Sequence, residues 1–223
     1  MDELWSILMF LGSAFCHQIP ERSYFLGDLQ MPLCARCIGL QLGFLLASLF
    51  MWTGARKFAS GMPDPKVLAV LTILFISGIL GAILSYAGLG GSGNLERTIS
   101  GLLIGIPLPF VVVPLLNGIV FPGRNARVLL RLPEDWAWLA AIFAVGGGAI
   151  LLSIYIAPLF YIVSILGVAD IFVFSFTMLT LLVAILWDKK IMTIKRRASI
   201  SSLLTILLIL LLAAIHNLLL PQI

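Results

Sequence analysis

The sequence predicts an all-α integral membrane protein, a bundle of about seven transmembrane helices. Hydrophobic residues make up 61% of the 223 residues and charged residues only 11%, with a mean hydropathy of +1.13. This composition lies well outside that of a soluble domain of the same length. Several apolar stretches also reach the roughly 20 residues that a helix needs to cross the hydrocarbon core of a bilayer. No stretch is left for a separate soluble domain.

Seven apolar segments are expected as helices. In chain order they are Glu3–Cys16, Cys37–Ala55, Lys66–Ala87, Arg97–Phe121, Asp135–Ala157, Leu159–Trp187 and Ser199–Leu219. The first is the shortest, and its alternative is a partly inserted arm of a re-entrant hairpin. It has neither the basic start nor the small-residue cleavage site of a signal peptide. We expect two regions: residues 1–121 hold the first four helices, and residues 122–223 hold the last three.

The loop between the first two expected helices carries strong turn signals. Pro20 and Pro32 bracket it, and Gly27-Asp28 marks a tight turn between them. The loop is therefore expected to fold back on itself and to bring its two ends together.

Basic residues predict the orientation of the bundle. Three alternate loops hold eleven of the fourteen: Arg56, Lys57, Lys66, Arg124, Arg127, Arg131, Lys189, Lys190, Lys195, Arg196 and Arg197. Because basic loops stay in the cytoplasm, we expect a plasma-membrane protein with its N-terminus cytoplasmic and its C-terminus extracytoplasmic. Contact of these loops with anionic lipid in the bilayer explains the pI of about 9.2, so no nucleic-acid partner is expected.

The densest chemical signal is the segment from Cys16 to Cys37, which contains every cysteine and one of the two histidines. Thiolate and imidazole are the usual ligands of zinc and other thiophilic metals. Three cysteines on the oxidising side of a membrane cannot all pair within one chain. We therefore expect a metal site of Cys16, His17, Cys34 and Cys37.

The fourth ligand of that site is open, because His17 is next to Cys16 and adjacent residues rarely reach one ion. Asp28, a water molecule or His216 are the other candidates. The alternative to a metal site is a disulfide with one spare thiol.

Three arginines lie on the expected extracytoplasmic side, where the orientation rule disfavours them: Arg22, Arg36 and Arg97. Arg97 follows the glycine-rich residues 90–94, which lead into a helix whose N-terminus favours an anion. We expect these arginines to bind a phosphate or carboxylate, from an anionic lipid or a small anion. The alternative is internal pairing with Glu21, Asp28 and Glu96.

Four polar residues fall within apolar segments. Gln41 lies one turn after Cys37, Asn117 near the inner end of the fourth helix, Asp170 near the middle of the sixth, and His216 near the outer end of the last. Polar groups inside a bilayer often mark a path for protons or ions. The alternative for Gln41, Asn117 and Asp170 is hydrogen bonding between helices. The alternative for His216 is a polar cap that ends its helix at the membrane interface.

Two motifs carry a family resemblance. Cys16–Ser23 reads Cys-His-Gln-x-Pro-x-Arg-Ser, and Pro32–Gly43 reads Pro-Leu-Cys-Ala-Arg-Cys-x-Gly-Leu-x-x-Gly. Together they resemble the signature of an uncharacterised family of predicted prokaryotic membrane proteins. Asn94-x-x-Arg97-x-x-x-Gly101 is a weaker match to the same family. The resemblance implies that the family domain covers the first four helices, and it implies no activity.

Three functional classes remain. The motifs of the common ATPases, dehydrogenases and membrane metalloproteases are absent from the sequence. The first class is a membrane protein with an extracytoplasmic metal site. The second is a thiol oxidoreductase using Cys34-Ala-Arg-Cys37, although it lacks the second cysteine pair of such relays. The third is a transporter or a protein that handles lipid or polyprenyl phosphate. The sequence does not decide whether the protein is an enzyme, nor its oligomeric state.

Overall fold

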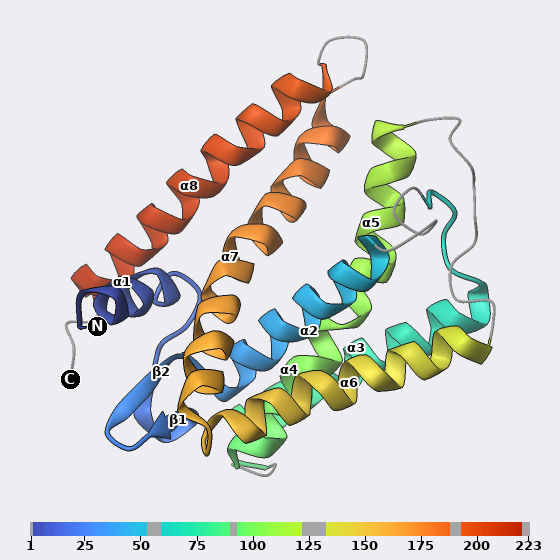
Figure 1. Cartoon of the computed structure of the whole chain (residues 1–223). Helices are drawn as coiled ribbons and strands as arrows, with labels where there is room; N and C mark the ends of the chain where they lie inside the picture. Colours follow the sequence, from blue (N-terminus) through green and yellow to red (C-terminus); the bar gives the residue numbers. More distant parts are fainter. Residues whose placement is uncertain (1, 53–58, 90–92, 122–132, 188–192, 220–223) are drawn as a thin grey trace.

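The computed structural model describes residues 2–52, 59–89, 93–121, 133–187 and 193–219, which form a helical bundle with one β-hairpin (Figure 1). The helices are α1 (Asp2–Gly12), α2 (Ala35–Trp52), α3 (Pro65–Tyr86), α4 (Asn94–Gly105), α5 (Pro107–Val120), α6 (Pro133–Ser153), α7 (Ala157–Leu186) and α8 (Ile194–Leu219). Within these ranges, six helical segments are long and apolar enough to cross a membrane: α2, α3, α4 with α5, α6, α7 and α8. The expected class, an all-α membrane protein, is confirmed.

The expected first span is instead a short helix, α1, lying along one end of the bundle. Its 11 residues are about 16 Å long, roughly half the thickness of the hydrocarbon core. Trp5, near its start, stacks on Phe160 at the beginning of α7, and Ser13, just beyond its end, accepts a hydrogen bond from Asn217 near the end of α8. Both ends of α1 therefore contact the same end of the bundle (Figure 1). This corrects the expectation that the segment crosses the bilayer, and it removes the reason for placing the two termini on opposite sides.

The expected fourth helix is divided into α4 and α5. Pro107 has no backbone N–H and its ring crowds the preceding turn, so the helical ladder breaks at Ile106. The two pieces still form one crossing of 27 residues, Asn94–Val120.

The loop after α1 contains a short 3₁₀ helix (Pro20–Arg22) and an antiparallel hairpin of β1 (Ser23–Leu26) and β2 (Leu29–Cys34). Its turn lies at Gly27-Asp28, as predicted, and Gly27 has the positive φ of 61° that glycine tolerates best. The hairpin is attached to α4, because the Tyr24 hydroxyl lies 2.9 Å from Thr98 Oγ1 and the Asn94 amide donates to the Ser23 carbonyl at 2.9 Å. The base of the hairpin, where Cys34 lies, is thereby held against the bundle.

The most extensive helix contact in the described bundle joins α2 and α4. It is built from two pairs of glycines four residues apart, Gly39 with Gly43 and Gly101 with Gly105. A Cβ atom on Gly101 would overlap the Arg36 carbonyl, and one on Gly105 would overlap the Leu40 carbonyl. Small residues at this spacing allow two membrane helices to approach backbone to backbone. The contact fixes the first turn of α2 against α4.

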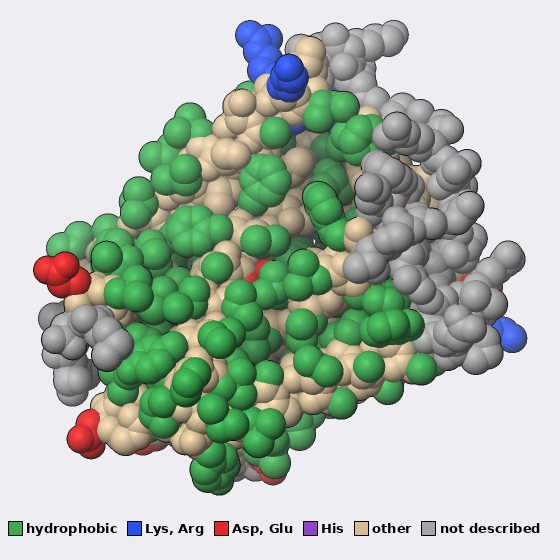
Figure 2. Space-filling model, in the orientation of Figure 1, with side chains coloured by type: hydrophobic (Ala, Val, Ile, Leu, Met, Phe, Trp, Pro, Cys, Tyr) green, Lys and Arg blue, Asp and Glu red, His purple; other side chains and the backbone are tan. Residues whose placement is uncertain are grey.

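The remaining helices surround this pair. In the apolar stretches of α2 and of α4 with α5, 61% of the residues are buried, against 17% for α3 and 22% for α8. Figure 2 shows hydrophobic side chains over most of the described surface on one face, with Lys and Arg at its upper edge. Such a surface matches contact with lipid rather than water.

Several residues used in the sequence analysis lie outside the described ranges. Among the basic residues they are Arg56, Lys57, Arg124, Arg127, Arg131, Lys189 and Lys190, and in the glycine-rich segment they are residues 90–92.

Substitution of Gly101 by alanine tests the α2–α4 contact. The added methyl group must push two backbones apart, so Gly101→Ala is expected to lower stability by about 1–3 kcal/mol. The matched control is Gly148→Ala on α6, where an added Cβ meets no atom within 4 Å. Thermal unfolding in detergent should show a lower melting temperature for the first variant only. Equal melting temperatures would show that the close approach is not required.

Candidate metal centre

Three cysteines from separate segments meet at one point beneath the hairpin. Cys16 follows α1, Cys34 is the last residue of β2, and Cys37 lies in the first turn of α2. Their Sγ atoms all lie within 4.8 Å of one another, and the structure holds all three as free thiols. A tetrahedral zinc ion with Zn–S bonds of about 2.3 Å separates its sulfur ligands by about 3.8 Å. Small side-chain rotations therefore suffice to enclose an ion.

Backbone groups already point at the sulfur atoms. Cys16 is 3% exposed, and its Sγ accepts hydrogen bonds from the N–H groups of Cys34 at 3.1 Å and Gln18 at 3.4 Å. The Cys37 thiol lies 3.8 Å from the Phe15 carbonyl. N–H donors of this kind stabilise a thiolate and orient it toward a metal.

The thiols also affect each other's ionisation. Hydrogen bonds from the thiols of Cys16 and Cys37 lower the pKa of Cys34. The hydrogen bond to Cys34 raises the pKa of Cys16, and burial raises it further. The first negative charge of the cluster therefore lies on Cys34, and a metal ion that binds all three sulfurs must release the remaining protons.

Gln18 positions the cysteine cluster. The sequence analysis did not select it as a site residue. Its side-chain amide donates to the Met9 carbonyl at 2.7 Å and to the Pro32 carbonyl at 2.9 Å, which joins α1 to β2. Its φ of 53° is unusual for a residue other than glycine, and this conformation turns its N–H toward Cys16. The only available signal was its position directly after Cys-His in the motif.

The other candidate ligands lie elsewhere. His17 is exposed and meets His216 of α8, with ring centroids 5.9 Å apart, so the two histidines of the chain are neighbours. Neither belongs to the group of close ligand atoms found among the described residues. Asp28 is in the hairpin turn, at the opposite end of β2 from Cys34. The described side chains thus bring three ligands together.

The three arginines gather beside this cluster. The guanidinium groups of Arg22 and Arg36 lie over the ring of Tyr86, at 4.9 and 5.2 Å from its centroid. Arg36 Nε donates to Ser100 Oγ at 3.2 Å. Arg97 is 8% exposed, and one of its terminal nitrogens donates to the Asn94 side chain at 3.2 Å.

The arginine cluster has more positive than negative charge around it. Arg22 and Arg36 are close enough to repel Arg97, while Cys34 and Glu96 attract it. In the part of the chain that the structure describes, none of the three guanidinium groups forms a salt bridge with a carboxylate. An electropositive neighbourhood stabilises thiolates, and it also attracts an external anion.

Gln41 of α2 and Asp170 of α7 lie deeper in the bundle. The two residues are at the same height along these neighbouring helices. On α2 and α7, Phe44 packs edge-on against Phe174 with centroids 5.0 Å apart, and Ile38 faces Gly167. Gln41 and Asp170 fall between these two contacts, and they are 3% and 0% exposed. Among the described residues, Gln41 Oε1 and both Asp170 carboxyl oxygens lack hydrogen-bond partners. An unpaired polar group in this position is costly, so it marks a possible functional site.

Asn117 is separate from both groups. Its amide donates to the Ala59 carbonyl at 2.9 Å, which attaches α5 to the segment before α3 at the other end of the bundle. The structure thus brings His216 toward the cysteine end and leaves Asn117 far from it.

Comparisons with known proteins support an uncharacterised membrane protein family. Residues 16–111 match the model of a family described as "Predicted membrane protein (DUF2085)". The chain is also 29% identical, over 111 residues, to the uncharacterised protein MJ1492 of Methanocaldococcus jannaschii, an alignment that covers 49% of this chain and 68% of that protein. No solved structure matches the chain. The resemblance is confirmed for this region, which holds the three cysteines, the three arginines and both glycine pairs.

Variants of Gln18 test its positioning role. Gln18→Ala removes two side-chain hydrogen bonds worth about 1 kcal/mol each and keeps a strained φ, whereas Gln18→Gly loses the same bonds but relieves the backbone. The expected order of melting temperatures is wild type, then Gly, then Ala. His17→Ala is the control, because that neighbouring side chain is exposed. An alanine variant as stable as wild type would show that Gln18 does not hold the loop.

Proposed function

We propose that this multi-pass membrane protein binds a zinc-like, thiophilic metal ion through Cys16, Cys34 and Cys37. One observation carries the proposal: three Sγ atoms from three segments lie within 4.8 Å of one another. Thiolates of this number and spacing suit zinc and other soft metals. The N–H donors on Cys16 Sγ support the same assignment, because they orient a ligand before the ion arrives.

Three protein ligands leave one coordination position open. Structural zinc sites are usually closed by four side chains, whereas sites that bind an external ligand retain an open position. Cys34 and Cys37 are only half-buried, so an external ligand would reach a bound ion from the surface of the bundle. When bound, the metal supplies a Lewis acid, and the arginines beside it offset the charge of the thiolates.

We also propose that the centre lies on the extracytoplasmic side of the plasma membrane. Lys66, Lys195 and Arg196 are exposed at the beginnings of α3 and α8, at the end of the bundle away from the cysteines. The positive-inside rule assigns that end to the cytoplasm. Because α1 does not cross, both chain ends then lie on the extracytoplasmic side.

Single substitutions of the cysteines test the metal site. Loss of a group that only hydrogen-bonds to a metal ligand typically weakens metal binding by about 10–100-fold. Because each cysteine is a direct ligand in this proposal, each Cys→Ser change is expected to weaken binding by more than about 100-fold. The purified protein is titrated with Co²⁺ or Cd²⁺, and the thiolate-to-metal charge-transfer absorption is recorded. His17→Ala and His216→Ala serve as controls and identify a histidine ligand if either weakens binding.

The same titration separates metal binding from redox chemistry. Three similar losses support one shared ion. If wild type shows no charge-transfer absorption and Cys34 with Cys37 is found oxidised, this pair is a disulfide or redox element, and the metal proposal is wrong. Thiol counting under non-reducing conditions gives the number of free thiols directly.

A second role is favoured by the unneutralised arginines. We propose that Arg22, Arg36 and Arg97 bind a phosphate or carboxylate beside the metal centre. The supporting observation is that no carboxylate among the described residues forms a salt bridge with them. Planar guanidinium groups bind such anions through paired hydrogen bonds.

Replacement of Arg36 and Arg97 tests the anion site. Inorganic phosphate should raise the melting temperature, relative to chloride at equal ionic strength, in wild type and in Arg196→Gln but not in Arg36→Gln or Arg97→Gln. Native mass spectrometry of co-purified lipid tells a lipid headgroup from a free anion. A lowered melting temperature with an unchanged phosphate response and unchanged lipid content would leave these arginines as support for the cysteine loop only.

A further inference from the structure

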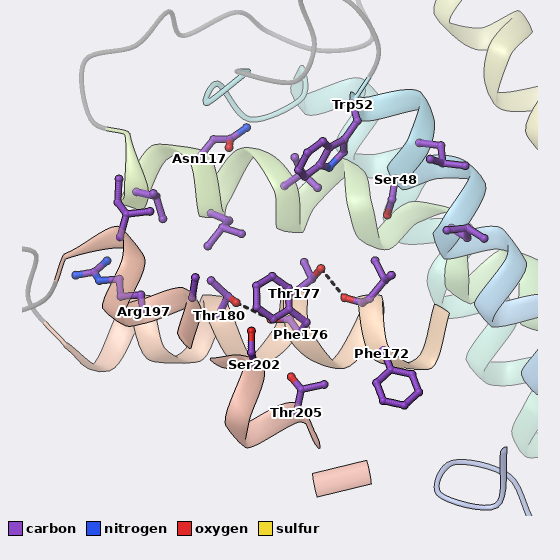
Figure 3. A pocket seen from close by; sticks show the side chains of 18 of the residues that line it. Ser48, Trp52, Asn117, Phe172, Phe176, Thr177, Thr180, Arg197, Ser202 and Thr205 are labelled. Atoms are coloured by element: carbon purple, nitrogen blue, oxygen red, sulfur yellow. Dashed lines mark hydrogen bonds between the residues drawn. The ribbon is translucent and has the colours of Figure 1, made fainter. Parts of the chain in front are cut away.

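The end of the bundle away from the cysteines contains a large cavity. Helices α2, α5, α7 and α8 diverge there and enclose about 910 Å³ (Figure 3). Leu45 and Trp52 of α2, Val113 of α5, Phe176 of α7 and Ile206 of α8 form part of its wall. This volume lies at the upper end of the roughly 300–1,000 Å³ that small-molecule sites occupy.

The cavity wall offers little to a polar solute. The hydroxyls of Thr177, Thr180 and Thr205 donate to carbonyls of their own helices at 2.6–2.7 Å. Their methyl groups therefore join the leucine, valine and phenylalanine side chains in an apolar surface. Water needs two to four polar partners to occupy such a space, whereas a hydrocarbon chain needs none.

Among the described residues, one charged side chain lines the cavity, Arg197 in the first turn of α8. It is 3% exposed, and one of its terminal nitrogens donates to the Trp187 carbonyl at 2.9 Å. Its Nε has no hydrogen-bond partner in the part of the chain that the structure describes, and no acidic residue lines the cavity there. A buried cation with no counter-charge among the described residues is costly, so this end of the cavity favours an anion.

We propose that the cavity binds one anionic phospholipid, with its phosphate on Arg197 and an acyl chain along the apolar wall. Charge complementarity selects the headgroup, because guanidinium binds phosphate through paired hydrogen bonds. Arg197 begins a membrane-crossing helix, and the wall runs from there toward the middle of α7, which is the direction a lipid takes from headgroup to tail (Figure 3). This site is independent of the metal centre.

The test compares two adjacent arginines. Wild type, Arg197→Gln and Arg196→Gln are purified, freed of lipid, and incubated with phosphatidylglycerol or phosphatidylcholine of the same chain length. Arg196 is exposed and does not line the cavity, which makes it the matched control. Native mass spectrometry should show wild type and Arg196→Gln retaining phosphatidylglycerol about tenfold better than phosphatidylcholine, and Arg197→Gln retaining both equally.

Further variants keep the test decisive. Ser202→Trp fills the cavity without changing charge and should reduce retention of both lipids, with a melting temperature near that of wild type. Equal headgroup preference in the two arginine variants would overturn the proposal, as would retention of palmitate in place of phosphatidylglycerol. Asp188 follows Trp187 in the sequence and lies outside the described residues. The proposal would also be wrong if Asp188→Asn lowered the melting temperature as much as Arg197→Gln while lipid retention stayed unchanged, since Arg197 would then serve an internal ion pair.

Discussion

The close contact of α2 with α4 is the constraint on which the rest of the cysteine end depends. Because glycines face carbonyl groups across it, the two helices cannot slide without a backbone clash. Thr98 Oγ1 of α4 reaches the Ala35 carbonyl at 3.2 Å and also bonds the Tyr24 hydroxyl of the hairpin. One side chain thus joins the beginning of α2, which carries Cys37, to the hairpin, which carries Cys34. The packing of the two helices therefore fixes Cys34 relative to Cys37, while the Gln18 contacts and the Cys34 N–H hold Cys16.

The two ends of the bundle have different origins along the chain. The cysteines, the arginines and the glycine contact all lie within residues 16–111, the region that matches the family. The cavity needs α7 and α8, which lie beyond this region, and so does the pairing of His17 with His216. The later helices also pack against the earlier ones in one hydrophobic cluster that includes Ile38, Phe160 and Ile209. They complete the bundle rather than form a separate unit.

Hydropathy and residue type predicted the membrane class, the six longer crossings together with a seventh that is instead α1, and the cysteine cluster, because these depend on local composition. They did not predict the course of α1, since a short apolar segment fits a span or an interfacial helix equally well until the partners of Trp5 are known. The contact of His17 with His216 joins residues far apart in the chain. The role of Gln18 depends on a backbone angle that no residue pattern specifies. In helices that are hydrophobic on every face, the sequence also has no periodic pattern that would show which face packs inside the bundle.

The charge around the cysteines bears on how the arginine cluster would suit the proposed metal site. The thiols of Cys16 and Cys37 hydrogen-bond to Cys34 and lower its pKa, so Cys34 is the first of the three thiols to lose its proton. With Cys34 ionised first, a divalent ion bound by three thiolates would replace the two remaining protons with two positive charges and leave the same net charge of the cluster. Under the proposed metal binding, the neighbouring arginines would therefore meet an unchanged field when a zinc-like ion binds. A monovalent ion would leave an additional negative charge there, which gives the arginines a way to discriminate between metals by charge.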